Sequence, residues 1–518
     1  MAIIISLSLS PEAAADESVL LKSACRRAKL DPAGVSSMRI IKRSVDARKR
    51  EIKINFTVEI FCINEVPLPL YAPFRPQDVT NRREVIIAGA GPAGLFAALR
   101  LIELGLRPVI FERGNDVSKR RRDIARISRE HLIDPESNYC FGEGGAGTFS
   151  DGKLYTRSKK KGDNKRVLEL FCSHGARDRI IYESHPHLGS DKLPGIITRI
   201  RNSIIDAGGI LLFNKRITDF MIHGNAITGI VVSGDERYNS SSVILATGHS
   251  ARDIYELCGR RNIRLEMKPL AMGVRIEHPQ ELIDSIQYHG RKRGEFLPPA
   301  SYRLVKQVNG RGVYSFCMCP GGFIVPSATS QEEVVVNGMS PSRRNSPFAN
   351  SGIVVEIKPE DLRSYSRSGV FAAMEYQKEL ERSAWINGDQ TQRAPAQRVT
   401  DFIKGVASSS LPEVSYLPGV ITSSLHSWLP AELAARLKKG LVEFDSVMKG
   451  FITKEAVILG VESRTSSPLR IPRLPDTGEH ITIRRLYPCG EGSGYAGGIV
   501  SSAVDGLRTA ELIAARSD

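Results

Sequence analysis

Apolar and polar residues alternate most regularly between Glu51 and Cys62. A period of two residues predicts a half-buried strand there. Upstream, Asp16–Leu30 has the spacing of a helix, and Ile3–Ser10 and Ser37–Val45 are two further strand candidates. The order strand, helix, strand, strand predicts a small N-terminal α+β domain of ferredoxin-like type.

A proline-rich stretch follows this domain, with Pro67, Pro69, Pro73 and Pro76 in close succession. Proline lacks the backbone N–H that helices and sheets need, so the stretch is predicted to be a stiff linker. The first domain boundary is placed near Asp78.

The next pattern is an apolar run, Val85–Ala88, followed by the string GAGPAG at Gly89–Gly94 and a helical stretch that ends at Gly105. A second apolar run then ends in Glu112, 18 residues beyond Gly94. Glycines at these positions permit a tight turn, close approach of a pyrophosphate, and packing of helix on strand. The complete order predicts a dinucleotide site in which Glu112 accepts hydrogen bonds from a ribose, as in FAD or NAD.

Two later segments favour FAD over NAD. The glycine-rich segment Leu486–Ile499 joins a short strand to the terminal helix Val500–Ala515. Such a turn brings backbone amides to the ribityl chain and directs a helix N-terminus at the flavin ring. The run Val243–Gly248 is a buried strand that ends in an Ala-Thr-Gly turn, which is typical of flavoproteins with this fold, although a plain strand end is the alternative.

With these elements the chain resembles the glutathione-reductase-like FAD superfamily. More narrowly, it resembles a bacterial family of largely uncharacterised FAD-dependent dehydrogenases, or NAD(P)/FAD-dependent oxidoreductases. Long strings such as FGEGGAGTFSDGKL (Phe141–Leu154) and VYSFCMCPGG (Val313–Gly322) carry the resemblance, which spans nearly the whole chain.

The resemblance implies an α/β fold. A discontinuous Rossmann-type FAD-binding domain occupies residues 79–265 and 460–518, an α+β cap or substrate domain is inserted at 266–459, and the ferredoxin-like domain and linker occupy 1–78. The cofactor-binding residues it implies are Gly89, Gly91, Pro92, Ala93, Gly94, Glu112, Arg113, Gly144, Gly145, Ala146, Gly147, Thr148, Thr247, Gly248, Gly490, Glu491, Gly497, Gly498 and Ile499. For Gly142–Gly147, a flexible turn is the alternative to a flavin loop.

Residues for the chemistry itself are less well defined by the sequence. The candidates for a base or an anion-binding cation near flavin N5 are His187, Lys192, His249, Arg275 and Arg464, and each has a structural role as its alternative. Arg464 is the preferred candidate for a carboxylate or phosphate clamp. Cys317 and Cys319 are interpreted as packed core cysteines rather than a redox dithiol, because a disulfide two residues apart is strained. No His, Cys or acidic group has metal-ligand spacing, so no metal is expected.

Composition narrows the class of protein without selecting a reaction. The net charge of +15 suits nucleic acid, an acidic membrane surface or an anionic cofactor equally, but its clusters, such as Lys159–Lys161, lack interleaved aromatics. No apolar segment is long enough to span a membrane, and eight scattered cysteines are typical of a cytoplasmic protein. The predicted function is a cytoplasmic FAD-dependent oxidoreductase acting on a small molecule, with NAD(P)H as candidate electron donor and no nucleic-acid partner. An RNA-modifying flavoprotein and a non-catalytic flavin-binding regulator are the alternatives.

Overall fold

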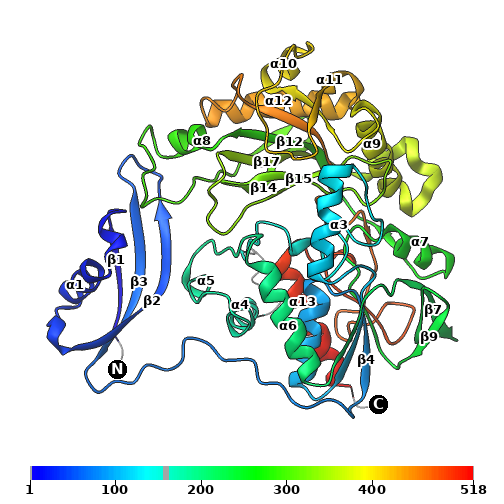
Figure 1. Cartoon of the computed structure of the whole chain (residues 1–518), viewed down its shortest axis with the longest axis horizontal. Helices are drawn as coiled ribbons and strands as arrows, with labels where there is room; N and C mark the ends of the chain where they lie inside the picture. Colours follow the sequence, from blue (N-terminus) through cyan, green and yellow to red (C-terminus); the bar gives the residue numbers. More distant parts are fainter. Residues whose placement is uncertain (1–2, 156–162, 517–518) are drawn as a thin grey trace.

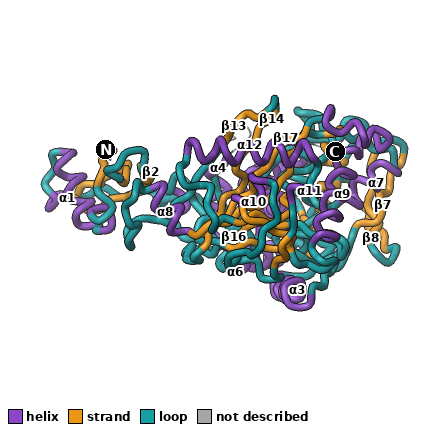
Figure 2. Tube along the Cα trace, turned by 90° about the horizontal axis from the view of Figure 1, so that it is seen from above, coloured by secondary structure: helices purple, strands orange, loops and turns teal. Residues whose placement is uncertain are grey.

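The computed structural model of the chain describes residues 3–155 and 163–516, so the basic cluster Lys159–Lys161 lies outside the described residues. Three units are visible in Figure 1: a small N-terminal sheet at one end, a unit around a parallel sheet, and a cap with a larger sheet. An extended segment joins the first unit to the second, and Figure 2 shows the N-terminal unit projecting from the rest.

The N-terminal unit is a three-stranded antiparallel sheet in the order β1-β3-β2, covered by one helix. Its elements are β1 (Ile3–Leu9), α1 (Glu17–Ala28), β2 (Val35–Asp46) and β3 (Lys53–Cys62). Alternate residues of β3 are buried, as the period of two predicts. A complete ferredoxin-like fold would have a second helix and a fourth strand. The described residues of this unit contain neither, because the proline-rich segment begins directly after β3.

The second unit is built on a parallel five-stranded sheet in the order β22-β10-β4-β5-β6. Its strands are β4 (Glu84–Ala88), β5 (Arg107–Phe111), β6 (Ile210–Leu212), β10 (Val243–Leu245) and β22 (Leu486–Pro488). Because β22 pairs with β10, the end of the chain returns to the sheet that begins at Glu84.

Side chains on the two faces of this sheet enter different cores. Val85, Ile87 and Ile110 pack under helices α2 (Pro92–Glu103), α6 (Leu193–Asp206) and α13 (Ile499–Ala514). Ile86 and Val109 pack against the antiparallel sheet of β7 (Ile217–His223), β8 (Ala226–Val232) and β9 (Glu236–Asn239). The unit therefore has three layers, with the parallel sheet in the middle, as buried parallel strands require. The remaining elements around it are α3 (Val117–Glu130), α4 (Asn164–Ser173), α5 (Arg179–Tyr182), α7 (Arg252–Arg260) and the short pair β11 (Glu266–Met267) and β21 (Leu469–Arg470).

The cap is a seven-stranded sheet in the order β13-β14-β17-β12-β20-β18-β19. Its strands are β12 (Leu270–Pro279), β13 (Val305–Val308), β14 (Arg311–Cys319), β17 (Phe348–Ile357), β18 (Ala394–Arg398), β19 (Val420–Thr422) and β20 (Val457–Glu462). The cap also contains the helices α8 (Gln280–Gln287), α9 (Ala372–Asn387), α10 (Val399–Lys404), α11 (Leu425–Trp428) and α12 (Ala431–Val447), the 3-10 helix η4 (Pro359–Phe371), and the hairpin β15 (Phe323–Pro326) and β16 (Val336–Met339).

The boundary predicted after residue 459 cuts β20, which pairs with β12 and β18 inside the cap sheet, so that sheet extends to Glu462. No helix among the described residues is long and apolar enough to cross a membrane.

Candidate active site

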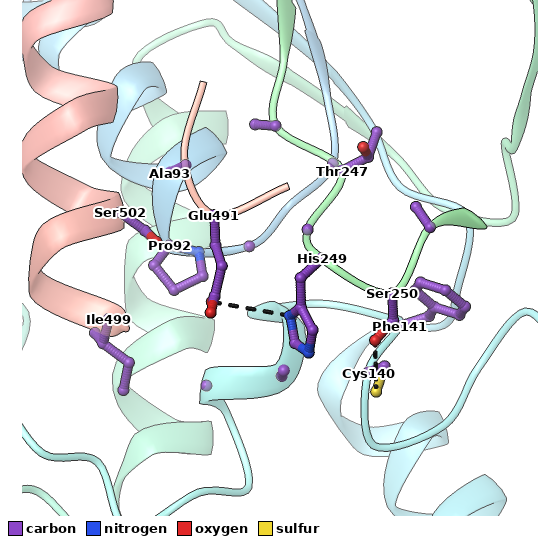
Figure 3. Close-up of a pocket in the computed structure, with 18 of the residues that line it drawn as sticks. Pro92, Ala93, Cys140, Phe141, Thr247, His249, Ser250, Glu491, Ile499 and Ser502 are labelled. Atoms are coloured by element: carbon purple, nitrogen blue, oxygen red, sulfur yellow. Dashed lines mark hydrogen bonds and ion pairs between the residues drawn. The ribbon is translucent and has the colours of Figure 1, made fainter. Parts of the chain in front are cut away.

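A cavity of about 670 Å³ opens between the parallel-sheet unit and the cap. This volume lies within the range of about 300–1,000 Å³ that is common for ligand and cofactor sites. Its walls come from the β4–α2 turn, the end of β10, the start of α13, the loop 140–153 and the cap strand β14. In Figure 3, Pro92 at the start of α2, Ile499 at the start of α13 and Glu491 surround the same space.

The β4–α2 turn has the close backbone contacts that its glycines predict. A Cβ on Gly89 would lie 2.5 Å from the Ala246 oxygen, and one on Gly94 would lie 2.0 Å from the Gly89 oxygen. Gly91 is the N-cap of α2 and no side chain caps the helix there, so its first N–H groups are available to a ligand. An uncapped helix N-terminus of this kind binds phosphate through N–H groups and helix dipole.

Glu112 lies at the end of β5, lines the cavity and is only 5% exposed. Its carboxylate accepts hydrogen bonds from the backbone N–H groups of Ala90 (2.8 Å), Gly114 (3.0 Å) and Gly142 (2.9 Å). These bonds join three loops around the cavity. Glu112 thus has a structural role that its sequence position did not reveal, and its contact with a ribose stays a prediction.

The loop that carries Gly144–Thr148 is held by a fully buried arginine. Arg120 on α3 donates hydrogen bonds to the carbonyl groups of Asn138 (2.8 Å), Tyr139 (2.9 Å) and Glu143 (2.7 Å). Burial lowers the pKa of Arg120 to about 10, at which the side chain is still cationic near neutral pH. The loop is therefore held from behind by a charged side chain, and its contact with the flavin stays a prediction.

The terminal turn closes the cavity from the other side. Gly490 donates to Asp505 Oδ2 (2.8 Å) and takes no part in the cavity wall, whereas Glu491 faces the cavity. Burial raises the pKa of Glu491 to about 7. A Cβ on Gly497 or Gly498 would meet no atom within 4 Å, and no side chain caps α13 at Gly498. A second uncapped helix N-terminus therefore faces open space in the same cavity.

Most of the predicted cofactor residues line this cavity, including Arg113, Thr247 and Gly248. The exceptions lie behind the wall and have structural contacts there; they are Gly94, Gly144, Thr148 and Gly490.

The five catalytic candidates separate into two groups. His249 and Arg464 line the cavity, whereas His187, Lys192 and Arg275 do not. His187 Nε2 bonds to the Ser342 carbonyl (3.1 Å), and Lys192 is exposed with its ammonium 3.6 Å from Asp191. The sequence could not show which side of their loop these side chains face.

The two candidate arginines are already paired with carboxylates. Arg464 contacts Glu381 (2.8 Å) and Glu333 (2.6 Å), which balance its charge and argue against the predicted anion clamp. Arg275 is fully buried and donates to Glu462 (2.7 Å) and Asn350 (2.8 Å) beneath β14. Both side chains therefore hold elements of the cap together. Their carboxylate partners are needed, because a buried charge without a partner would destabilise the fold.

The cap end of the cavity holds residues that the sequence did not single out, including Lys153, Asn337 and Tyr155. Lys153 Nζ lies 3.6 Å from Asp151 and 3.7 Å from Cys317 Sγ. Cys317 is exposed and lines the cavity, which corrects its interpretation as a packed core cysteine; Cys319 is buried as predicted. Lys153 lies inside the string FGEGGAGTFSDGKL, and this unusual string was the feature of the sequence that could have pointed to Lys153 as a site residue.

The arrangement is that of a dinucleotide-binding protein with a capped cavity. Residues 269–465 match the family described as "FAD-dependent protein, C-terminal domain-like", and residues 1–61 match the domain of unknown function DUF8436. The glycine turn, the two uncapped helix ends and the open space at Gly497 fit an elongated dinucleotide. FAD is the cofactor of this protein.

The chain is 40% identical over 524 residues to an uncharacterised protein of Clostridium beijerinckii, and the match covers 97% of each chain. It belongs to the same family as that protein. Among solved structures, it is similar to CtdE in complex with FAD (12% identity, 84% of each chain, TM-score 0.33). It is also similar to L-proline dehydrogenase from P. horikoshii (14% identity, 85% of this chain and 94% of that chain, TM-score 0.34). Both structural likenesses are weak, and the assignment rests on the family match and on the geometry of the cavity.

Proposed function

We propose that the protein is an FAD-dependent oxidoreductase of the glutathione-reductase-like superfamily, which exchanges hydride with a small molecule held between the flavin and the cap. The observation that carries this proposal is the cavity itself. Two uncapped helix N-termini face it from one side, and a cap with polar and titratable groups closes it from the other.

The two helix N-termini indicate how FAD would be oriented in the cavity. The start of α2 at the GAGPAG turn is suited to the pyrophosphate, with Glu112 on the adenosine side. The start of α13 at Gly498 is suited to the ring, because its positive dipole stabilises negative charge that develops there on reduction. When bound, FAD would supply a two-electron carrier that exchanges hydride at N5.

Substrate contacts in this proposal come from the cap end. Lys153 provides a cation, and Asn337 provides an amide that can donate or accept a hydrogen bond. Although burial alone would lower it, the pKa of Lys153 is raised, because Cys317, Cys319 and Asp151 surround its ammonium. A lasting positive charge at this end suits a substrate with an anionic or electron-rich group.

The test is anaerobic reduction of the FAD-loaded protein, followed by the loss of oxidised-flavin absorbance. NADH, NADPH and a metabolite library are mixed with the wild-type chain and with Lys153→Met, and Arg121→Met on the exposed side of α3 is the control. We expect one class of donor to reduce the wild type and the control at equal rates and Lys153→Met at least tenfold more slowly. Reduction by no donor would contradict an enzymatic role and support a flavin-binding regulator.

A further inference from the structure

The cap strand β14 ends in two cysteines whose backbone departs from regular strand geometry. The pairing of β14 with β17 shifts register between Phe316 and Cys319, and Cys317 has a φ of 45°. In a regular strand, residues two apart share one face and one environment. The irregularity instead leaves Cys317 exposed to the cavity while Cys319 stays buried.

The irregular backbone is held in place from inside the cap. The buried Arg275 donates through Nη2 to the Cys317 carbonyl (2.9 Å), and the Cys319 thiol donates to the same oxygen (3.2 Å). Arg275 is itself fixed by Glu462 at 2.7 Å. The position of Cys317 in the cavity wall is therefore built by a buried, paired side chain.

Both sulfur atoms face one ammonium group. Lys153 Nζ lies 3.7 Å from Cys317 Sγ and 3.9 Å from Cys319 Sγ, and it also donates to the Met318 carbonyl. Its other neighbour is Asp151, which pairs with Arg344 at 2.7 Å. A shared cation beside two thiols stabilises one thiolate between them.

The two thiols divide the roles that a redox pair needs. Hydrogen bonding from Cys319 lowers the pKa of Cys317 most, and the charges of Lys153 and Arg275 lower it further against burial and Asp151, which raise it. The same hydrogen bond and burial raise the pKa of Cys319. Cys317 and Glu491 of the terminal turn line the same cavity.

We propose that Cys317 and Cys319 form a redox-active dithiol at the cap end of the cavity, and that the substrate class of the site is a small disulfide. This inference rests on the proposed function, because the flavin is the source of electrons. Cys317 is the attacking sulfur, since it is the one open to the cavity, and Cys319 is the resolving sulfur.

The Cys317 thiolate attacks one sulfur of the disulfide RSSR, forms a mixed disulfide and releases RS⁻, which takes a proton from water. Cys319 then attacks Cys317 Sγ, its proton passes to the second RS⁻, and the Cys317–Cys319 disulfide forms. Returning this disulfide to a thiol and a thiolate takes two electrons and one proton, the equivalent of one hydride from the donor that the holoenzyme oxidises. A disulfide between residues two apart is strained, and strained disulfides are the readily reduced ones.

The decisive experiment traps the intermediate by mass spectrometry. Reduced, FAD-loaded wild type, Cys317→Ser, Cys319→Ser and the control Cys62→Ser are treated anaerobically with 2-hydroxyethyl disulfide, quenched with acid and digested. We expect an internal disulfide in the Cys317–Cys319 peptide of the wild type and control, and a stable mixed disulfide on Cys317 in Cys319→Ser. Labelling of Cys62 without any modification of the Cys317–Cys319 peptide would overturn the proposal. The wild-type peptide map decides this without relying on a variant.

A second readout separates a thiolate from an ordinary thiol. The rate of Cys317 alkylation by iodoacetamide is measured against pH in the holoprotein, and Lys153→Met is compared with Arg121→Met. We expect reaction at pH 6–7 in the wild type and a drop of roughly tenfold or more in Lys153→Met at that pH. A profile that rises only near the pKa of a free thiol, about 8.5, in all three proteins would overturn the proposal.

Failure of this inference and failure of the proposed function give different results. Flavin reduction by hydride donors is recorded in the same samples. If donors reduce the flavin but no adduct forms on Cys317, the dithiol is wrong and the oxidoreductase stands. If the adduct forms but no donor reduces the flavin, the dithiol exchanges without the proposed electron source and the oxidoreductase is wrong.

Discussion

The Glu491 carboxylate lies 3.8 Å from His249 Nδ1, and both side chains face the cavity (Figure 3). Burial raises the pKa of Glu491 to about 7, and burial lowers that of His249 to about 4. Between these values both groups are neutral, so the contact is a carboxylic acid beside an imidazole rather than an ion pair. A neutral acid there can donate a hydrogen bond to a ligand hydroxyl.

This pKa shift has a measurable effect on the stability of the apoprotein. A carboxyl whose folded pKa lies above its unfolded value of 4.5 holds its proton better in the folded state, so its contribution is complete below pH 4.5 and is lost as pH rises through 7. We expect the loss of stability between pH 4.5 and 8 to be smaller by about 3 kcal/mol in Glu491→Gln than in wild type, because the substitution removes the shifted carboxyl. Denaturant unfolding at several pH values measures this difference.

The exposed Glu295 provides the control, since Glu295→Gln removes a carboxyl from the surface instead of the cavity. An identical pH dependence in Glu491→Gln and wild type would show that Glu491 ionises normally.

Arg120 is predicted to support the flavin loop through its hydrogen bonds to four loop carbonyl groups. Arg120→Met leaves these buried acceptors without donors, so we expect the free energy of unfolding to fall by about 3 kcal/mol and FAD affinity to fall at least tenfold. Its neighbour Arg121 is exposed on the same helix, and Arg121→Met should change neither quantity measurably. Equal effects of the two substitutions would exclude a specific role for Arg120.

Gly94 is predicted to be required for packing of α2 on the sheet, although it does not line the cavity. A Cβ there lies 2.0 Å from the Gly89 backbone oxygen, so Gly94→Ala must displace the turn. We expect a loss of about 2 kcal/mol of stability together with weaker FAD binding. Gly34→Ala is the matched control, because a Cβ at Gly34 meets no atom within 4 Å. Thermal unfolding and flavin fluorescence titration report the two effects, and a Gly94→Ala chain that matched the control in both would be incompatible with this packing.

Local patterns were sufficient to predict the β4–α2–β5 unit and the terminal turn. The strand period, the glycine spacing and the terminal acid lie within one short segment, and β22 pairs with β10 as the return of the chain requires. The contacts of Glu112 show the limit of this reasoning, because two of its three donors, Ala90 and Gly142, come from other loops that lie far from it in the sequence.

The cap end of the site could not be predicted from local sequence patterns, because it depends on contacts between distant elements. Arg275 and Arg464 are conspicuous in the sequence, but their partners Glu462 and Glu381 come from other elements of the fold, and pairing removes them as free cations. Cys317 enters the cavity only because the register of β14 shifts, and a register shift depends on the neighbouring strand rather than on local sequence.

The central claim is that FAD occupies the cavity with its ring beside the start of α13. Gly497→Trp tests it most directly, since a side chain built there enters open space instead of protein. We expect the free energy of unfolding of the Gly497→Trp apoprotein to lie within about 1 kcal/mol of the wild-type value, as for a surface substitution. In a flavin fluorescence titration, Gly497→Trp should bind no FAD, whereas wild type and Gly34→Trp should bind one FAD per chain. Unchanged FAD binding by a folded Gly497→Trp protein would contradict the account.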